Sequence, residues 1–109
     1  MAMTHKVLGQ SNPAATTLTT LYTVPASTQS IASTLSVCNI GTVSTTYRIA
    51  VRPAGASIAN QHYLAYDTVV SANDTILLTL GIALATTDVI SVYAGTADIS
   101  FSVFGVEVS

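Results

Sequence analysis

Charged side chains are scarce in this sequence. Only 7% of its 109 residues are Asp, Glu, Lys or Arg, whereas about 25% is usual for a soluble domain. The 41 residues from Val7 to Tyr47 carry no formal charge, and the only basic residues are Lys6, Arg48 and Arg52. Proteins that bind nucleic acid cluster Lys and Arg against the phosphates, so nucleic acid is not an expected partner.

Several other features are lacking, and each absence argues against a class of protein. The single cysteine, Cys38, allows no intrachain disulfide and no cysteine-based zinc site, and we expect it to be a small buried residue. His5 and His62 are too few and too separated for a metal site, so no metal or cofactor is expected. The apolar segment 75–90 is interrupted by Thr, Gly and Asp, whereas a membrane span needs about 18 apolar residues in a row. The N-terminal residues lack the apolar core of a signal peptide, and no membrane attachment is expected.

Hydroxyl groups take the place of charge, with 17 Thr and 12 Ser. β-branched residues are frequent, while Glu and Lys occur once each, which favours strands over helices. Alternating runs between turn signals predict eight short strands, at residues 4–10, 18–24, 28–39, 44–52, 61–67, 75–80, 88–94 and 98–108. This spacing is typical of an antiparallel β-sandwich, here expected to be jelly-roll-like. We expect one sandwich domain over residues 14–109, with residues 1–13 as an N-terminal arm or a first edge strand.

The alternation also predicts which side chains share a face. In the segment 47–52, Tyr47, Ile49 and Val51 point one way, and Arg48 and Arg52 point the other, about 13 Å apart at roughly 3.3 Å per residue. The two arginines are candidates for pairing with acids of a neighbouring subunit, and a solvated pair is an equal alternative.

Two further strands are given faces in the same way. In the segment 31–38, Ile31, Leu35 and Val37 are expected on one face and Ala32 on the opposite one. In the last strand the apolar residues change phase after Val103, which predicts a β-bulge around Phe104–Gly105 and makes Gly105 the least replaceable glycine.

Asp74, Asp88 and Asp98 each stand just before an apolar run. A short carboxylate at such a position accepts hydrogen bonds from nearby backbone N–H groups. We interpret these residues as turn-forming rather than catalytic.

The densest group of functional side chains is the segment 60–68, "NQHYLAYDT". On an extended strand His62 and Tyr66 would share one face, and Tyr63 and Asp67 the other. The main interpretation is a strand with two half-buried tyrosines and a His62–Asp67 pair closing its end. The alternatives are a contact between subunits and a carbohydrate site.

No enzyme motif is present. A Gly-x-Ser-x-Gly elbow and a glycine-rich phosphate loop are both missing. A Ser-His-Asp triad can assemble from residues far apart in sequence, so a hydrolase is retained as a minor hypothesis. The prediction is a protein without catalytic activity.

The strands expected at 18–24 and 28–39 contain no Lys, Glu or Pro to protect a sheet edge. Uncharged open edges pair with other chains. The economical way to cover such a surface is a symmetric homo-oligomer, and contacts with few ions are insensitive to salt.

Several segments resemble a family of small virion structural proteins of tailed bacteriophages, cyanophages among them. The segments are "LYTVPA", "SVCN", "YRIAVRPAG", "HYLAYD", "NDTILLTLGIAL", "TTDVISVYAG" and "ISFSVFGVE", and together with "KVLGQSNPAATTLTT" they span nearly the whole chain. The resemblance implies a β-sandwich in a phage particle and brings no catalytic residues.

These observations favour a capsid decoration (cement) protein. It would sit as a homotrimer on the virion surface and bridge subunits of the major capsid protein, after synthesis in the host cytoplasm. The alternatives are a neck, tail or baseplate component of the same particle, and a carbohydrate-binding receptor module with Tyr63, Tyr66, His62 and Asp67 as the sugar platform.

Overall fold

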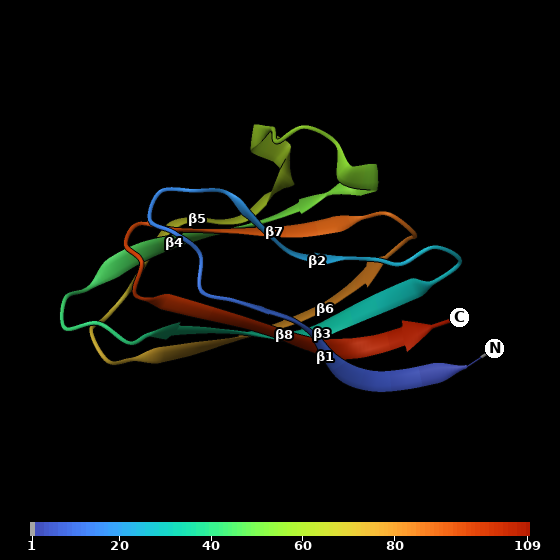
Figure 1. Ribbon diagram of the computed structural model, residues 1–109, viewed down its shortest axis with the longest axis horizontal. Coiled ribbons are helices and arrows are strands. Elements are labelled where there is room, and N and C mark those ends of the chain that lie inside the picture. The colour runs from blue at the N-terminus through green and yellow to red at the C-terminus, as the bar shows by residue number, and fades with distance from the viewer. Residues whose placement is uncertain (1) are drawn as a thin grey trace.

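The computed structural model describes residues 2–109, which form two antiparallel sheets packed face to face (Figure 1). Sheet A has the strand order β1 (Met3–Ser11), β8 (Ile99–Val108), β3 (Gln29–Asn39) and β6 (Thr75–Leu84). Sheet B has the order β2 (Thr19–Thr23), β7 (Val89–Ala94), β4 (Thr45–Arg52) and β5 (Tyr63–Val70). Two 3-10 turns, η1 (Pro53–Gly55) and η2 (Asn60–His62), lie between β4 and β5 and project beyond sheet B (Figure 1).

The strand pairing is that of a jelly roll. β1 pairs with β8, β2 with β7, β3 with β6 and β4 with β5, all antiparallel, so the chain forms one long ribbon wrapped into a sandwich. The all-β sandwich predicted from the alternation is therefore confirmed. Residues 3–11, within the expected arm or edge strand, form β1 at the edge of sheet A, and Met1 lies outside the described residues.

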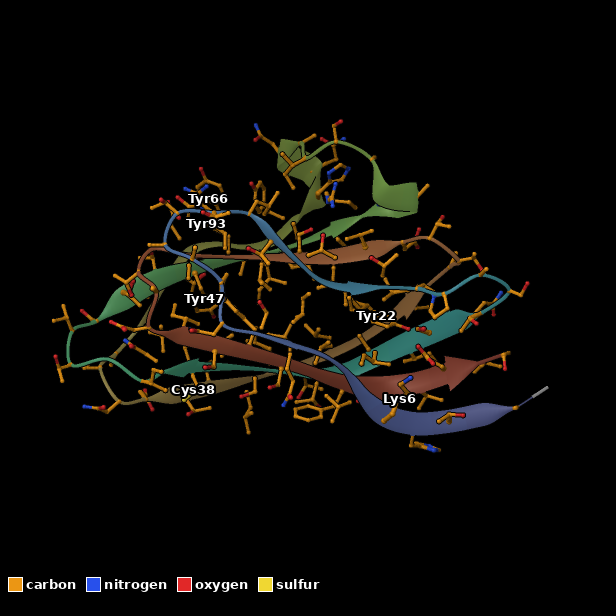
Figure 2. All side chains as sticks on the ribbon, in the orientation of Figure 1. Lys6, Tyr22, Cys38, Tyr47, Tyr66 and Tyr93 are labelled. Carbon is orange, nitrogen blue, oxygen red and sulfur yellow. The ribbon has the colours of Figure 1, made fainter. Side chains whose placement is uncertain are left out.

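The core lies between the sheets and is built from alternate residues of each strand. Tyr47 and Ile49 are buried and Val51 packs against them, so the expected alternation of β4 is correct. The Tyr47 ring (labelled in Figure 2) meets Phe101 of the opposite sheet nearly edge-on, with ring centroids 6.5 Å apart. This aromatic pair joins the two layers at the centre of the sandwich.

The predicted faces of β3 are wrong at its N-terminal half. Ala32 is fully buried and Ile31 is 45% exposed, the reverse of the expectation. The cause is an extra residue, Ser33, opposite the step from Gly105 to Phe104 of β8. An extra residue reverses the side on which side chains point, so residues before and after Ser33 follow opposite phases.

The bulge predicted in β8 is also misplaced, because β8 alternates without interruption. Val103 and Gly105 point inward and Phe104 is 37% exposed on the outer face. The irregularities lie in the two neighbours, between Val7 and Gly9 in β1 and at Ser33 in β3. A Cβ on Gly105 would overlap the carbonyl oxygen of Ile31, so this glycine is required by the close approach of β3.

Two expectations about β3 fail for topological reasons. The strand lies between β8 and β6, so residues 28–39 are not an open edge, although β2 is one. Cys38 pairs with Ser100 and Thr75 on the outer face of sheet A and is partly exposed (Figure 2), so it is not a buried core residue. β6 also runs on through Gly81, beyond its expected end at residue 80, and this glycine adopts a φ of +62° within the strand.

Candidate functional site

Arg48 is the centre of an aromatic cluster on the outer face of sheet B. Its guanidinium carbon lies 4.1 Å from the ring centroid of Tyr66 and 4.2 Å from that of Tyr93, which places the cation between two π faces. Tyr93 is the cross-strand partner of Arg48 on β7, and Tyr66 lies on β5 at the other side of β4. Figure 2 shows Tyr66 and Tyr93 side by side on sheet B. We call Arg48, Tyr63, Tyr66, Asp67 and Tyr93 the aromatic cluster.

Asp67 fixes the orientation of Arg48. Arg48 Nε donates to Asp67 Oδ1 at 2.7 Å and Nη2 donates to Oδ2 at 3.3 Å. This bidentate ion pair holds the planar guanidinium in one orientation. This hydrogen bond raises the pKa of the Arg48 guanidinium above its ordinary value. The Asp67 side chain is 45% exposed, and an ion pair at such a surface contributes little to stability. The pair neutralises the arginine and leaves a planar, oriented contact group.

A backbone irregularity in β5 makes this geometry possible. Tyr47 pairs with Thr68 and Ile49 with Ala65, so both Tyr66 and Asp67 stand opposite Arg48. Asp67 adopts a φ of +51°, in the left-handed region that Asp tolerates better than most residues. The bulge therefore turns the tyrosine and the carboxylate toward the same arginine.

Tyr63 extends the cluster along β5. Its ring centroid lies 4.9 Å from that of Tyr66 and the two rings are nearly perpendicular. Asn60, Tyr63 and Tyr66 line a shallow hollow of about 360 Å³. The strand irregularities bring the two tyrosines together, although simple alternation placed them on opposite faces.

The expected His62–Asp67 pair does not form. His62 ends η2, and its Nδ1 accepts a hydrogen bond from the Ala59 N–H at 3.1 Å, while Asp67 faces Arg48. The prediction assumed an extended chain from Asn60, whereas residues 60–62 form a 3-10 turn. His62 therefore closes the turn that precedes Tyr63 and does not bind Asp67.

Arg52 has its hydrogen-bond partners within its own chain. Its Nε donates to Ser91 Oγ at 3.1 Å, and its Nη1 donates to the carbonyl oxygens of Gly55 at 3.4 Å and Ala56 at 3.0 Å. Arg52 therefore anchors η1 to sheet B, and the structure does not bring it together with Arg48.

Asp74 and Asp88 bind backbone amides at turns. Asp74 Oδ1 accepts from the Thr75 N–H at 2.9 Å. Asp88 accepts from the Ala54 N–H and the Ala85 N–H, both at 2.9 Å, and so ties η1 to the loop before β7. These contacts are structural.

A second polar network, which the sequence did not suggest, links the two sheets. The Tyr22 hydroxyl donates to Glu107 Oε2 at 2.6 Å and lies 2.6 Å from Ser30 Oγ, and Lys6 Nζ lies 3.1 Å from Glu107 Oε1 (Tyr22 and Lys6 in Figure 2). Burial, followed by the hydrogen bond to Glu107, raises the pKa of Tyr22 to about 12. The hydrogen bonds from Tyr22 and Lys6 lower the pKa of Glu107. An unbroken alternation from Ile99 would have placed Glu107 on the inner face. The bulge expected around Phe104–Gly105 led to the opposite face for Glu107, so the network was not predicted.

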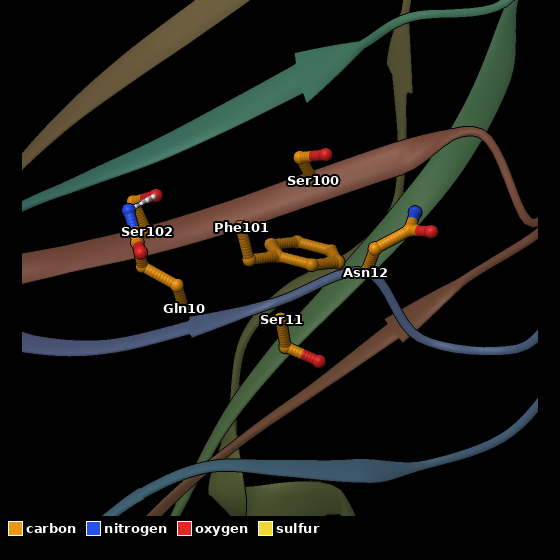
Figure 3. Close-up of a pocket in the computed structure, with 6 residues that line it drawn as sticks. All are labelled: Gln10, Ser11, Asn12, Ser100, Phe101 and Ser102. Carbon is orange, nitrogen blue, oxygen red and sulfur yellow. Dashed lines mark hydrogen bonds between the residues drawn. The ribbon is translucent and has the colours of Figure 1, made fainter.

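A hollow of about 390 Å³ lies over β1 and β8 (Figure 3). Its lining residues are Gln10, Ser11, Asn12, Ser100, Phe101 and Ser102. Gln10 donates to Ser102 Oγ at 3.3 Å, and the Asn12 amide donates to the carbonyl oxygens of Ala97 and Ile99 at 3.0 and 2.7 Å. Gln10, Asn12 and Ser102 already bond within the protein, and a lining of hydroxyls and amides is suited to polar contact rather than to proton transfer.

Within residues 2–109 no group of three or more His, Cys, Asp or Glu side chains is arranged to hold a metal ion. Over the same residues, no helix has the length and apolar character needed to cross a bilayer. Comparison with protein-family models, with curated proteins and with solved structures gives no match for this chain.

Proposed function

We propose that this protein is a non-enzymatic structural subunit of a bacteriophage particle. In the form we favour it is a capsid decoration protein that assembles with its own copies as a homotrimer and bridges subunits of the major capsid protein. It would be made in the host cytoplasm and reside on the virion surface. The proposal rests on the surface of sheet A, with the sequence resemblance as a second line of support.

The outer face of sheet A is apolar near the chain termini. Register aligns Met3 with Val108, His5 with Val106 and Ile31, and Val7 with Phe104 across β1, β8 and β3. We call these residues, except His5, the apolar patch: Met3, Val7, Ile31, Phe104, Val106 and Val108. Met3 is 62% exposed, and Val7, Ile31 and Phe104 are also exposed. Contiguous exposed apolar surface of this kind marks a site of protein contact.

The rest of that face carries hydroxyls. Ser36 pairs with Ser102 and Leu77, and Thr34 pairs with Phe104 and Thr79. Lys6 of β1 and Glu107 of β8 belong to the opposite face of sheet A, and their side chains bind each other. A face without Asp, Glu, Lys or Arg can be covered by protein with little cost for removing charges from water.

The fold and the aromatic cluster agree with this role. Jelly rolls are common among viral coat proteins and lectins, which is support by analogy only. Tyr and Arg are the residues that most often dominate binding energy at protein interfaces, so the aromatic cluster is a candidate contact with a partner protein. Many modest contacts repeated around a lattice add up through multivalency.

The test is the position of the polypeptide in intact particles, by labelling with an antibody and electron microscopy. We expect it on the head lattice. Detection at the neck, tail or baseplate would replace the decoration role with the alternative of another virion component, and absence from purified particles would overturn the proposal.

The hollow lined by Asn60, Tyr63 and Tyr66 supports one second candidate, a carbohydrate-binding module. An exposed tyrosine beside an amide can contact a sugar ring and its hydroxyls. However, Arg48 covers one face of Tyr66 and Tyr63 meets the same ring, so a sugar would have to use the part of Tyr66 that remains exposed, 56% of the residue. Glycan-array binding that disappears in Tyr66→Ala would establish this function, and its absence would exclude it.

A further inference from the structure

The four edge strands of the sandwich differ in how they are protected. β1 carries Lys6 and an irregularity next to Gly9, β2 has only five residues with a register shift, and β5 carries the bulge at Asp67. Charges, bulges and short length all discourage pairing with another chain. β6 is the exception: residues 75–79 run in unbroken register with residues 34–38 of β3, and the chain carries no charge from Thr75 to Thr87.

The hydrogen-bond phase of β6 shows which backbone groups are free. The Asn39 N–H donates to the Asp74 carbonyl at 2.9 Å, one position beyond the Cys38–Thr75 pair. Since hydrogen-bonded and non-hydrogen-bonded pairs alternate in antiparallel sheets, Ile76 and Leu78 bond to β3. Thr75, Leu77 and Thr79 then direct their backbone groups away from β3, toward the open edge.

The side chains of β6 are also incompletely covered. Leu77 is 68% exposed on the outer face. Ile76 and Leu78 point inward and pack against the core, yet remain partly exposed. Another strand beyond β6 would cover apolar side chains on both faces of sheet A.

We propose that β6 pairs antiparallel with β6 of a second copy, around a two-fold axis at Leu77. The uninterrupted segment runs from Thr75 to Thr79 and ends at the irregularity near Gly81, so its midpoint is Leu77. Each Leu77 exchanges backbone hydrogen bonds with its symmetry mate, and Thr79 donates to the carbonyl of Thr75. The Thr75 N–H keeps its bond to Asp74 Oδ1.

The charge distribution is what selects a second copy as the occupant. With the axis at Leu77, Thr75 faces Thr79 and Asp74 faces Leu80, so no like charges meet and threonines form cross-strand pairs. This contact rests on the proposed function and names the partner: it joins a subunit of one trimer to a subunit of the next, separately from the contacts that make the trimer.

The experiment measures the mass of the purified full-length protein by sedimentation equilibrium from micromolar to millimolar concentration. Leu77→Lys places two cations face to face, and Leu77→Pro removes an N–H that β3 does not use. Val69→Lys is the matched control, because Val69 is 61% exposed on the edge strand β5. Circular dichroism and the melting temperature monitor folding of each variant.

We expect the wild-type mass, counted in multiples of 11.2 kDa, to be at least twice the mass of either Leu77 variant at the same concentration, and Val69→Lys to keep the wild-type mass. Equal masses for wild type and the Leu77 variants, or an equal loss in Val69→Lys, would overturn the pairing. If the Leu77 variants lose mass relative to the wild type but the protein is absent from purified particles, the proposed function alone is rejected. If the protein is found in particles but the Leu77 variants keep the wild-type mass, the pairing alone is rejected.

Discussion

Replacing Gly105 with alanine should destabilise the fold far more than the loss of a glycine ordinarily does. A Cβ at this position would overlap the Ile31 carbonyl oxygen and lie 3.0 Å from its carbon and 3.1 Å from the Ala32 Cα. These are backbone atoms of a central strand, so the clash is relieved only by moving β3 away from β8. Overpacking of this kind costs about 3 kcal/mol.

The matched control is Gly81→Ala. Gly81 has a φ of +62°, and a Cβ added there would meet no atom within 4 Å, so its substitution costs only the left-handed conformation, roughly 1 kcal/mol. With an unfolding entropy of about 2.1 cal/mol/K per residue, the two variants should lose about 13 °C and about 4 °C in melting temperature. Differential scanning calorimetry at neutral pH measures both. A Gly105→Ala loss no greater than that of Gly81→Ala would refute the claim that contact with β3 requires this glycine.

Four further predictions concern charge. Because the pKa of Tyr22 is raised to about 12, its contribution to stability is complete below pH 10 and is lost as the pH rises toward 12, and Tyr22→Phe should flatten this alkaline decline in urea midpoints. Because the pKa of Glu107 is lowered, its contribution is present above about pH 4.3, its unfolded value, and is lost as the pH falls through the folded value; Glu107→Gln should remove that acid dependence, and an unchanged profile would contradict it. Asp67→Asn should leave the urea midpoint almost unchanged because the Arg48 pair is exposed, and a clear fall in the midpoint would show that the pair organises β5. Assemblies should keep their mass in molar salt when measured by light scattering, and dissociation by salt alone would show that ions hold them together.

The strands themselves were largely predictable. For six of the eight, the expected limits agree with the observed ones within one residue at each end, because alternation and turn residues are both local properties of the sequence. β6 runs beyond its expected end because Gly81 continues the strand with a positive φ. β5 begins later than expected because residues 60–62 form a 3-10 turn, and it runs on to Val70. A glycine between apolar residues indicates a turn or a bulge equally well.

Phase within the strands was harder to predict, for a physical reason. The apolar positions of β8 are out of phase with those of its neighbours β1 and β3. An extra residue in β8, or one in each neighbour, would bring them back into phase equally well. Only the pairing shows that Ser33 is the extra residue and that Gly105 faces inward. A single strand's sequence does not contain its partner's register.

In the candidate site too, residue type could be predicted from the sequence, whereas contacts that depend on strand register could not. Tyr63, Tyr66 and Asp67 were selected as one group from residue type and Arg48 as a separate candidate, and the structure brings these four together. Tyr93 was missed because its contact with Arg48 depends on the register between β7 and β4. The His62–Asp67 pair failed because a 3-10 turn replaced the assumed strand.

Most of the few charged side chains of this chain interact within the same subunit, and this limits the kinds of contact that the protein can make with other molecules. All three basic residues have partners in their own subunit: Lys6 binds Glu107, Arg48 binds Asp67, and Arg52 binds Ser91 and backbone carbonyls. Contacts with other molecules must then rely on what is left at the surface, which is the apolar patch, the hydroxyls and the free backbone groups of β6. Such contacts have short range and little dependence on ionic strength. They give slow, weakly steered encounters between free subunits but accumulate when many copies are held on one lattice, which is the setting we propose for this protein.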